Sequence, residues 1–168
     1  MLKVNCLQGR WQNVLFPAIV LLIVTIDQST KVWIRSNLAL GQSLLELGFF
    51  RLTHIHNTGA AFGLFQGQSF PLTVISLVGV AVLIAYTIFI YRVYRHSPFL
   101  NYDLCKSALC LILGGTVGNL IDRLRFGYVT DFINFNLWPA FNIADLAVTI
   151  GVILFAYFLF SITRTTQH

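Results

Sequence analysis

Charged side chains are scarce in this sequence, and acidic ones are the scarcest. Of its 168 residues, 57% are hydrophobic, 10% are charged and only 6 are Asp or Glu, and the mean hydropathy is +0.75. A soluble domain typically has about 25% charged residues, so this chain cannot cover itself with a polar surface. The composition excludes an ordinary soluble domain and indicates an integral membrane protein, with residues 1–168 forming a single domain.

Cysteine and histidine are also few, and neither type is clustered. The cysteines form no Cys-x-x-Cys pair, which supports neither a metal site nor a disulfide framework, and we interpret them as small apolar residues: Cys6, Cys105 and Cys110. Among the histidines, His96 and His168 stand alone. His54 and His56 form the run "HIH", which can bind a metal ion but fits alternation in a short strand better.

Basic residues outnumber acidic ones, with 11 Lys and Arg and a formal net charge of +5. Such a balance can indicate a nucleic-acid partner, but the sequence contains no basic tract or stacking motif. The cations sit beside apolar runs, where they suit the anionic headgroups of membrane lipids. We therefore expect contact with membrane lipids and none with nucleic acid.

Four apolar stretches are long enough for transmembrane helices, which need roughly 20 mostly apolar residues. Helices are expected because each backbone polar group in lipid must be satisfied within its own segment. The predicted spans are residues 14–34, 70–91, 102–121 and 142–162. The first apolar run begins only after Asn13 and lacks a clear small-residue cleavage site, so we expect a retained helix and not a cleavable signal peptide.

Four spans place both chain ends on one side of the membrane. The basic residues divide almost evenly between the two faces, whereas the acidic ones favour the face opposite the termini, and we place both termini in the cytoplasm. The segment 35–69 is too long for a tight turn. Its run "FFRLTHIHNTGAAFGLF" predicts short strands and a turn at the outer membrane surface.

Four of the aspartates are expected at that outer face. Asp27 and Asp122 lie near the ends of spans, Asp145 lies in the first turn of the last span, and Asp131 lies in a short loop. Ionisable residues in membrane spans are costly and are functional candidates by default. Asp27 is followed four residues later by Lys31, the favourable order for a helical ion pair, and we interpret these two as a structural pair.

Two Asn-x-x-Asp motifs add to this pattern: "NLID", with Asn119 and Asp122, and "NIAD", with Asn142 and Asp145. Positions i and i+3 share a helix face, so each Asn can donate a hydrogen bond beside its Asp. Arg123 follows directly and can neutralise a neighbouring carboxylate. Helix capping explains one such motif, but it explains two motifs and a further aspartate in the loop poorly.

Several carboxylates without a Ser–His or Cys–His pair suit the chemistry of aspartic proteases. Two carboxylates held close share one proton, so the ionised one can activate water while the protonated one donates to the carbonyl oxygen under attack. Spacing alone leaves open whether Asp145 pairs with Asp122 or with Asp131. Two other classes remain: a transporter or proton channel, which acids gathered at one face disfavour, and a non-catalytic assembly subunit.

Five motifs give a specific resemblance that covers nearly the whole chain. The chain resembles the lipoprotein signal peptidases (signal peptidase II), which are membrane aspartic proteases of bacteria. The motifs, in order, are "DQSTK" at 27–31, "NTGAAFG" at 57–63, "GGTVGNLIDR" at 114–123, "VTDF" at 129–132 and "FNIAD" at 141–145. The resemblance implies an α-helical integral membrane protein: a four-transmembrane-helix bundle with a small extracytoplasmic β-cradle and a surface helix, built largely from residues 35–69.

By the same resemblance, the catalytic dyad is Asp131 and Asp145, and Asp122 is their neighbour, held by Arg123. The family's dyad-supporting or substrate-binding residues map onto Asn57, Gly59, Asn119, Asp122, Arg123, Asn142 and Ala144. The sequence departs from the family in two places. Residue 130 is Thr where many relatives have an aliphatic residue, and the loop 132–144 between the dyad aspartates is short.

The implied substrate is a prolipoprotein whose lipobox cysteine already carries diacylglyceryl. The implied reaction is cleavage before that cysteine, which frees the signal peptide. We expect an enzyme of the bacterial cytoplasmic (inner) membrane, with its active site near the outer face. It is expected to need no metal or other cofactor and to act as a monomer.

Overall fold

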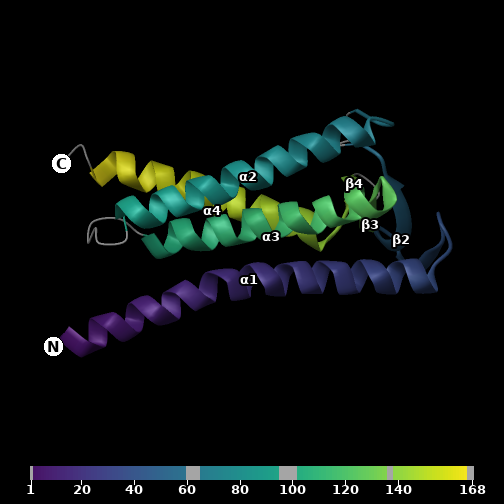
Figure 1. The fold of residues 1–168 in the computed structure, drawn as a ribbon. Helices are drawn as coiled ribbons and strands as arrows, with labels where there is room; N and C mark the ends of the chain where they lie inside the picture. Colours follow the sequence, from purple (N-terminus) through teal and green to yellow (C-terminus); the bar gives the residue numbers. More distant parts are fainter. Residues whose placement is uncertain (1, 60–64, 95–101, 136–137, 166–168) are drawn as a thin grey trace.

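The computed structural model describes residues 2–59, 65–94, 102–135 and 138–165. Its helices are α1 (Leu2–Asn37), α2 (Ser69–Tyr94), α3 (Tyr102–Phe126) and α4 (Ile143–Thr165). Its strands are β1 (Ser43–Leu47), β2 (Phe50–Asn57), β3 (Val129–Phe135) and β4 (Trp138–Phe141). The helices run lengthwise, with the sheet at one end of the bundle and both chain ends at the other (Figure 1).

All four described helices are long and apolar enough to cross a membrane, which confirms the predicted four-helix architecture. All four helices end a few residues later than predicted, and two of these extensions bear on the site. Helix α1 continues to Asn37 and α3 continues to Phe126, whereas the sequence suggested ends at 34 and 121. As a result, Arg35 and Asp122 lie within helices at the sheet end of the bundle.

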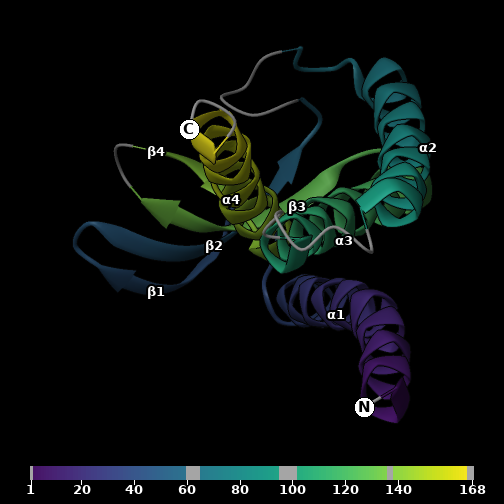
Figure 2. The same cartoon turned by 90° about the vertical axis from the view of Figure 1, so that its left-hand side faces the viewer.

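Helix α3 is the centre of the bundle and packs against each of the other helices, as Figure 2 shows from the end. Two glycines allow this close approach. A Cβ added to Gly118 would lie 2.6 Å from Oδ2 of Asp27, and one added to Gly115 would lie 2.7 Å from Cγ2 of Val148. Small residues at helix interfaces let backbones approach in lipid, where burial alone does not drive helices together.

Two groups of buried apolar residues lie at opposite ends of the molecule. The group far from the sheet comprises Ile90, Cys105, Leu109 and Phe158, and the group beside the sheet comprises Ile34, Leu38 and Phe132. Cys105 and Cys110 are buried free thiols, as expected of small apolar residues. The side chain of Cys6 lies outside the described part of the chain, as do His96 and His168.

The sheet is antiparallel, with strand order β1-β2-β3-β4. Strand β2 contains His54 and His56 and confirms the strand that "HIH" suggested. Within segment 35–69, from which the surface helix was expected, residues 60–64 lie outside the described residues; the described remainder between α1 and α2 is strand and turn.

The expectation that residues after Tyr128 form a loop is wrong, because they form β3 and β4. Gly127, with φ of 76°, ends α3 in a left-handed conformation, and its N–H donates to the carbonyl oxygen of Arg123 at 3.0 Å. The chain then turns back, and the β-branched and aromatic residues of β3 pair with β2. Asp131 is thereby held in a strand.

Candidate active site

The four aspartates predicted at one face are brought together at the junction of the helices and the sheet. They come from α1, α3, β3 and α4, and they are Asp27, Asp122, Asp131 and Asp145. The first three are at most 1% exposed, and Asp145 is half-buried. A carboxylate buried in this way must be paired or hydrogen-bonded to persist, and each of them is.

Asn142 joins Asp131 to Asp145. Its side-chain amide donates to Oδ1 of Asp131 at 2.7 Å, and its backbone N–H donates to Oδ2 of Asp145 at 3.2 Å. Its own Oδ1 accepts the backbone N–H of Asp145 at 2.9 Å. These reciprocal bonds between residues three apart form a capping box at the start of α4. The "NIAD" motif is thus a helix cap and a bridge between the two carboxylates at once.

Two further asparagines each hold one carboxylate. Asn119 donates from Nδ2 to Oδ1 of Asp145 at 2.7 Å. Asn57 donates from Nδ2 to Oδ2 of Asp131 at 2.8 Å, and its own Oδ1 accepts the N–H of Gly59 at 2.9 Å. Asn57 reaches Asp131 because Ile55 is paired with Asp131 in the sheet, so that Asn57 stands diagonally across on the same face.

Asp27 and Lys31 form the expected ion pair, at 2.8 Å, but both side chains do more than stabilise one helix end. Oδ1 of Asp27 accepts the backbone N–H of Ala144 at 3.0 Å, so α1 caps the first turn of α4. Nζ of Lys31 donates to Oδ1 of Asn119 at 2.8 Å. The buried pair therefore contacts the groups that surround Asp145.

Asp122 is held differently from the prediction. Its ion-pair partners are Lys31 at 3.5 Å and Arg35 at 3.3 Å, whereas Arg123 donates to the carbonyl oxygen of Gly59 at 3.3 Å. The expectation that Arg123 holds Asp122 is wrong, because successive residues of a helix point in different directions. Asp122 is thus paired with two cations, and it takes no part in the Asn142 bridge between Asp131 and Asp145.

Thr130, one of the departures from the family pattern, belongs to this ion-pair cluster. Its hydroxyl accepts a hydrogen bond from Nη1 of Arg35 at 2.8 Å, and its backbone N–H donates to Oδ2 of Asp122 at 2.9 Å. Arg35 also lies over the ring of Phe126, with 4.5 Å from Cζ to the ring centroid. An aliphatic residue at position 130 would leave one guanidinium donor without this acceptor.

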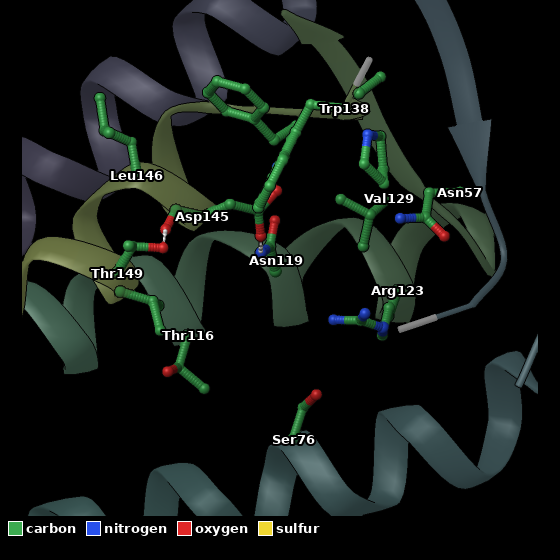
Figure 3. Close-up of a pocket in the computed structure, with 14 residues that line it drawn as sticks. Asn57, Ser76, Thr116, Asn119, Arg123, Val129, Trp138, Asp145, Leu146 and Thr149 are labelled. Atoms are coloured by element: carbon green, nitrogen blue, oxygen red, sulfur yellow. Dashed lines mark hydrogen bonds between the residues drawn. The ribbon is translucent and has the colours of Figure 1, made fainter. Parts of the chain in front are cut away.

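A pocket of about 450 Å³ lies beside these residues, between α2 and the α3–α4 pair. Ser76 of α2 faces Asn119 and Arg123 of α3 across it, and Asp145 and Thr149 line it from α4 (Figure 3). Its rim on the sheet side includes Trp138, Pro139, Ala140 and Phe141 of β4. Asp145 thus faces the open pocket.

Asp131 lies behind the pocket wall and is 1% exposed. Burial, together with the charge of Asp145, raises the pKa of Asp131 to about 7, although the hydrogen bonds from Asn57 and Asn142 oppose the change. An acid with a pKa near 7 that interacts with a second carboxylate can hold a proton at neutral pH while the second one is ionised. This arrangement can activate a water molecule and protonate a carbonyl oxygen.

Of the residues predicted to support the dyad, Asn57, Asn119 and Arg123 line the pocket. Asn142 and Ala144 are buried behind it, where Asn142 bridges Asp131 and Asp145 and the backbone N–H of Ala144 donates to Asp27. Three residues that line the pocket or contact Asp122 were not predicted from the sequence: Arg35, Gln28 and Ser76. Gln28 donates to Asp122 Oδ1 at 3.2 Å, and its place within "DQSTK" was the signal that could have indicated it.

The two histidines of β2 lie outside this cluster. Their ring centroids are 4.9 Å apart, and His56 stacks on Tyr128 at 3.6 Å. Burial, then the neighbouring His54 and Arg35, lower the pKa of His56. Within the described ranges, no three His, Cys, Asp or Glu side chains form a group that can hold a metal ion.

The comparisons with known proteins all indicate the same family. The model of the family described as signal peptidase (SPase) II matches residues 19–161. A lipoprotein signal peptidase of Moorella thermoacetica is 46% identical over 143 residues, which are 84% of this chain and 90% of that protein. One from Dehalococcoides mccartyi is 51% identical over 130 residues, covering 77% and 79% of the two chains. A solved bacterial membrane enzyme superposes with a TM-score of 0.75 at 32% identity, with 88% of each chain covered. The chain therefore belongs to the signal peptidase II family of bacterial membrane proteases.

Proposed function

We propose that this chain is an aspartic endopeptidase that removes the signal peptide from diacylglyceryl-modified prolipoproteins. In this proposal it cuts before the lipidated cysteine, and Asp131 and Asp145 form the dyad that activates water. The similarity to proteins named lipoprotein signal peptidases supports a lipoprotein signal peptide as the substrate.

The observation that supports Asp131 and Asp145 as the dyad is the bridge through Asn142. This one residue donates to Asp131 from its side chain and to Asp145 from its backbone, and it lies beside the pocket that Asp145 lines. Asp122 has no such bridge to Asp145, because its carboxylate forms ion pairs with Lys31 and Arg35. The geometry therefore favours Asp131 over Asp122 as the partner of Asp145.

The proposed reaction starts with one proton on the dyad. The ionised carboxylate takes a proton from water, whose oxygen attacks the scissile carbonyl carbon, while the protonated carboxyl group gives its proton to the carbonyl oxygen. When the tetrahedral intermediate collapses, the C–N bond breaks and a proton passes to the leaving amine. The dyad again holds one proton at the end, so water is the only co-reactant.

Membrane geometry supports the same proposal. We place the site at the outer face, with both termini in the cytoplasm, because the signal helix of a prolipoprotein lies within the bilayer and its lipid anchors in the outer leaflet. The scissile bond is then held at the depth of the sheet end, where water is present. Anchoring at two points orients the bond, and orientation can supply much of the catalytic effect. We expect the monomer to suffice.

The direct test compares a purified prolipoprotein carrying diacylglyceryl with the same protein lacking it, each incubated with the purified enzyme. Only the lipid-modified form should be cut, and mass spectrometry should place the cut immediately before the lipidated cysteine. Equal cleavage of both forms would contradict the proposed substrate.

The dyad is tested by Asp131→Asn and Asp145→Asn, each expected to lower the rate by at least ~10³-fold while the protein still inserts. Asp103→Asn is the matched control, since it removes an exposed acid at the other end of α3. Asp122→Asn should reduce stability more than catalysis, because it breaks buried ion pairs. Full activity of Asp131→Asn, with loss in Asp122→Asn, would refute the assignment.

A further inference from the structure

Lys31 is fully buried, and its ammonium group contacts three acceptors. These are Oδ2 of Asp27 at 2.8 Å, Oδ1 of Asn119 at 2.8 Å and Oδ2 of Asp122 at 3.5 Å. A pair that only stabilised α1 would need only Asp27. The contact with Asn119 is different, because it leads in one step to Asp145.

The donor properties of lysine fix the orientation of the Asn119 amide. An ammonium group has three donors and no acceptor, so the Asn119 atom that faces Lys31 must be oxygen. The nitrogen then faces Asp145, where it donates to Oδ1 at 2.7 Å. Asn142 strengthens the same orientation by donating from Nδ2 to Oδ1 of Asn119 at 3.1 Å. Asp145 is left facing an amide that can only donate.

The second oxygen of Asp145 also faces a pure donor, the backbone N–H of Asn142. Asp145 lies in the first turn of α4, where the helix dipole stabilises a negative charge. Both of its oxygens therefore accept hydrogen bonds, and the amide at one of them is polarised by the buried ammonium of Lys31. Charge-assisted hydrogen bonds of this kind are stronger than neutral ones.

Asp131 has a different environment. Its donors are the amides of Asn57 and Asn142, and the oxygens of these amides accept backbone N–H groups of Gly59 and Asp145 instead of a cation. Its burial raises its pKa to about 7. The two members of the dyad thus differ in the charge behind their hydrogen-bond donors.

We propose that Lys31 is a positioning residue of the active site, which fixes the Asn119 amide so that Asp145 is the ionised member of the dyad and Asp131 holds the proton. The inference rests on the proposed function. In the reaction, Asp145 takes the proton from water at the pocket surface, and Asp131 gives its proton to the carbonyl oxygen. Lys31 acts through Asn119 and does not contact the substrate.

Other charged and titratable groups surround Lys31 and Asp145, and a test of Lys31 must keep their charges paired. Helix α2 contributes Ser76 to the pocket and β2 contributes Asn57. The titratable His54 lies against His56, which stacks on Tyr128. The charged groups in the cluster come from α1, α3 and β3: Asp27, Arg35, Asp122, Arg123 and Asp131. Removing Lys31 alone would leave a buried carboxylate unpaired, which is strongly destabilising.

The experiment therefore removes Lys31 together with the charge of Asp27. It compares Asp27→Asn/Lys31→Met with Asp27→Asn, in which Lys31 remains with Asn119 and Asp122 as its acceptors. Lys106→Met is the control for losing a lysine elsewhere in the bundle. kcat and KM are measured against pH with a lipid-modified substrate. The double variant should have its acidic limb of kcat moved to higher pH by about one pH unit, with KM within about twofold.

Asn119→Ser gives a second test in case the double variant does not fold. It leaves the Asp27–Lys31–Asp122 ion pairs in place, but its side chain is too short to join Lys31 to Asp145. The same shift of the acidic limb is expected. An unmoved acidic limb in the folded variants would overturn the role of Lys31. Full activity of Asp145→Asn would instead overturn the proposed function, so the two failures are distinguishable.

Discussion

Replacing Gly115 by Ala tests whether the close packing of α3 against α4 sets the geometry of the dyad. The added Cβ would lie 2.7 Å from Cγ2 of Val148 and closer still to the carbonyl oxygen of Ala144. A helix carbonyl cannot rotate away, so the first turn of α4 must retreat by roughly 1 Å, and Asp145 is the next residue. Overpacking of this kind costs about 1–3 kcal/mol, and a 1 Å misplacement near the chemistry can cost about 100-fold in rate.

The assay is the initial rate of cleavage of a lipid-modified prolipoprotein, measured together with the thermal midpoint of the purified enzyme. Gly79→Ala is the matched control, because it adds the same methyl group to α2 where nothing lies within 4 Å. Gly114→Ala is intermediate, since its Cβ would lie 3.0 Å from Cβ of Ile23, a side-chain atom. If Gly115→Ala kept a rate within about twofold of the wild type, the argument that packing at this glycine positions Asp145 would be refuted.

Two further predictions concern pH and the helix cap. Because burial and Asp145 raise the pKa of Asp131 to about 7, kcat should fall about tenfold per pH unit above that value. The folded state also holds this proton more tightly than the unfolded chain, so the stability that it contributes is complete below about pH 4 and is lost as the pH rises towards 7. The thermal midpoint of the wild type should therefore fall between about pH 4 and pH 7, and that of Asp131→Asn should stay level. A midpoint that rises with pH in both proteins would contradict the assignment. Asn142→Ala should lower the unfolding free energy by about 1 kcal/mol through loss of the cap and the rate by about 100-fold or more through loss of the bridge. Asn142→Ser, which can still cap α4, should recover the stability but not the rate; recovery of both would show that the bridge is dispensable.

The architecture could be predicted from composition and length. The four apolar stretches stand out because lipid requires each span to satisfy its own backbone. The alternation around "HIH" was sufficient to predict β2, because β-branched and aromatic residues fit a pleated surface. The convergence of the aspartates also followed from alternating topology, which places the ends of successive spans at alternate faces.

The details of the site could not be predicted because they depend on helix ends and on which side chains meet across helices. Arg35 lies just beyond the predicted end of the first span at residue 34, so its place in the helix is not predicted. In the structure it lies on the same face of α1 as Asp27 and Lys31, one turn further on. Asp131 appeared to lie in a loop, since sequence spacing does not show that β2 offers an edge for β3. The contact between Lys31 and Asn119 joins residues 88 positions apart.

The bridge through Asn142 also has a consequence for biosynthesis. The groups that hold the proposed dyad are drawn from α1, β2, α3, β3 and the start of α4, so the last-made helix supplies both Asp145 and the residue that joins it to Asp131. A nascent chain with only three helices inserted carries one member of the dyad and none of the bridge. Under the proposed mechanism, proteolysis therefore requires the insertion of α4, and a chain truncated before α4 is expected to be inactive.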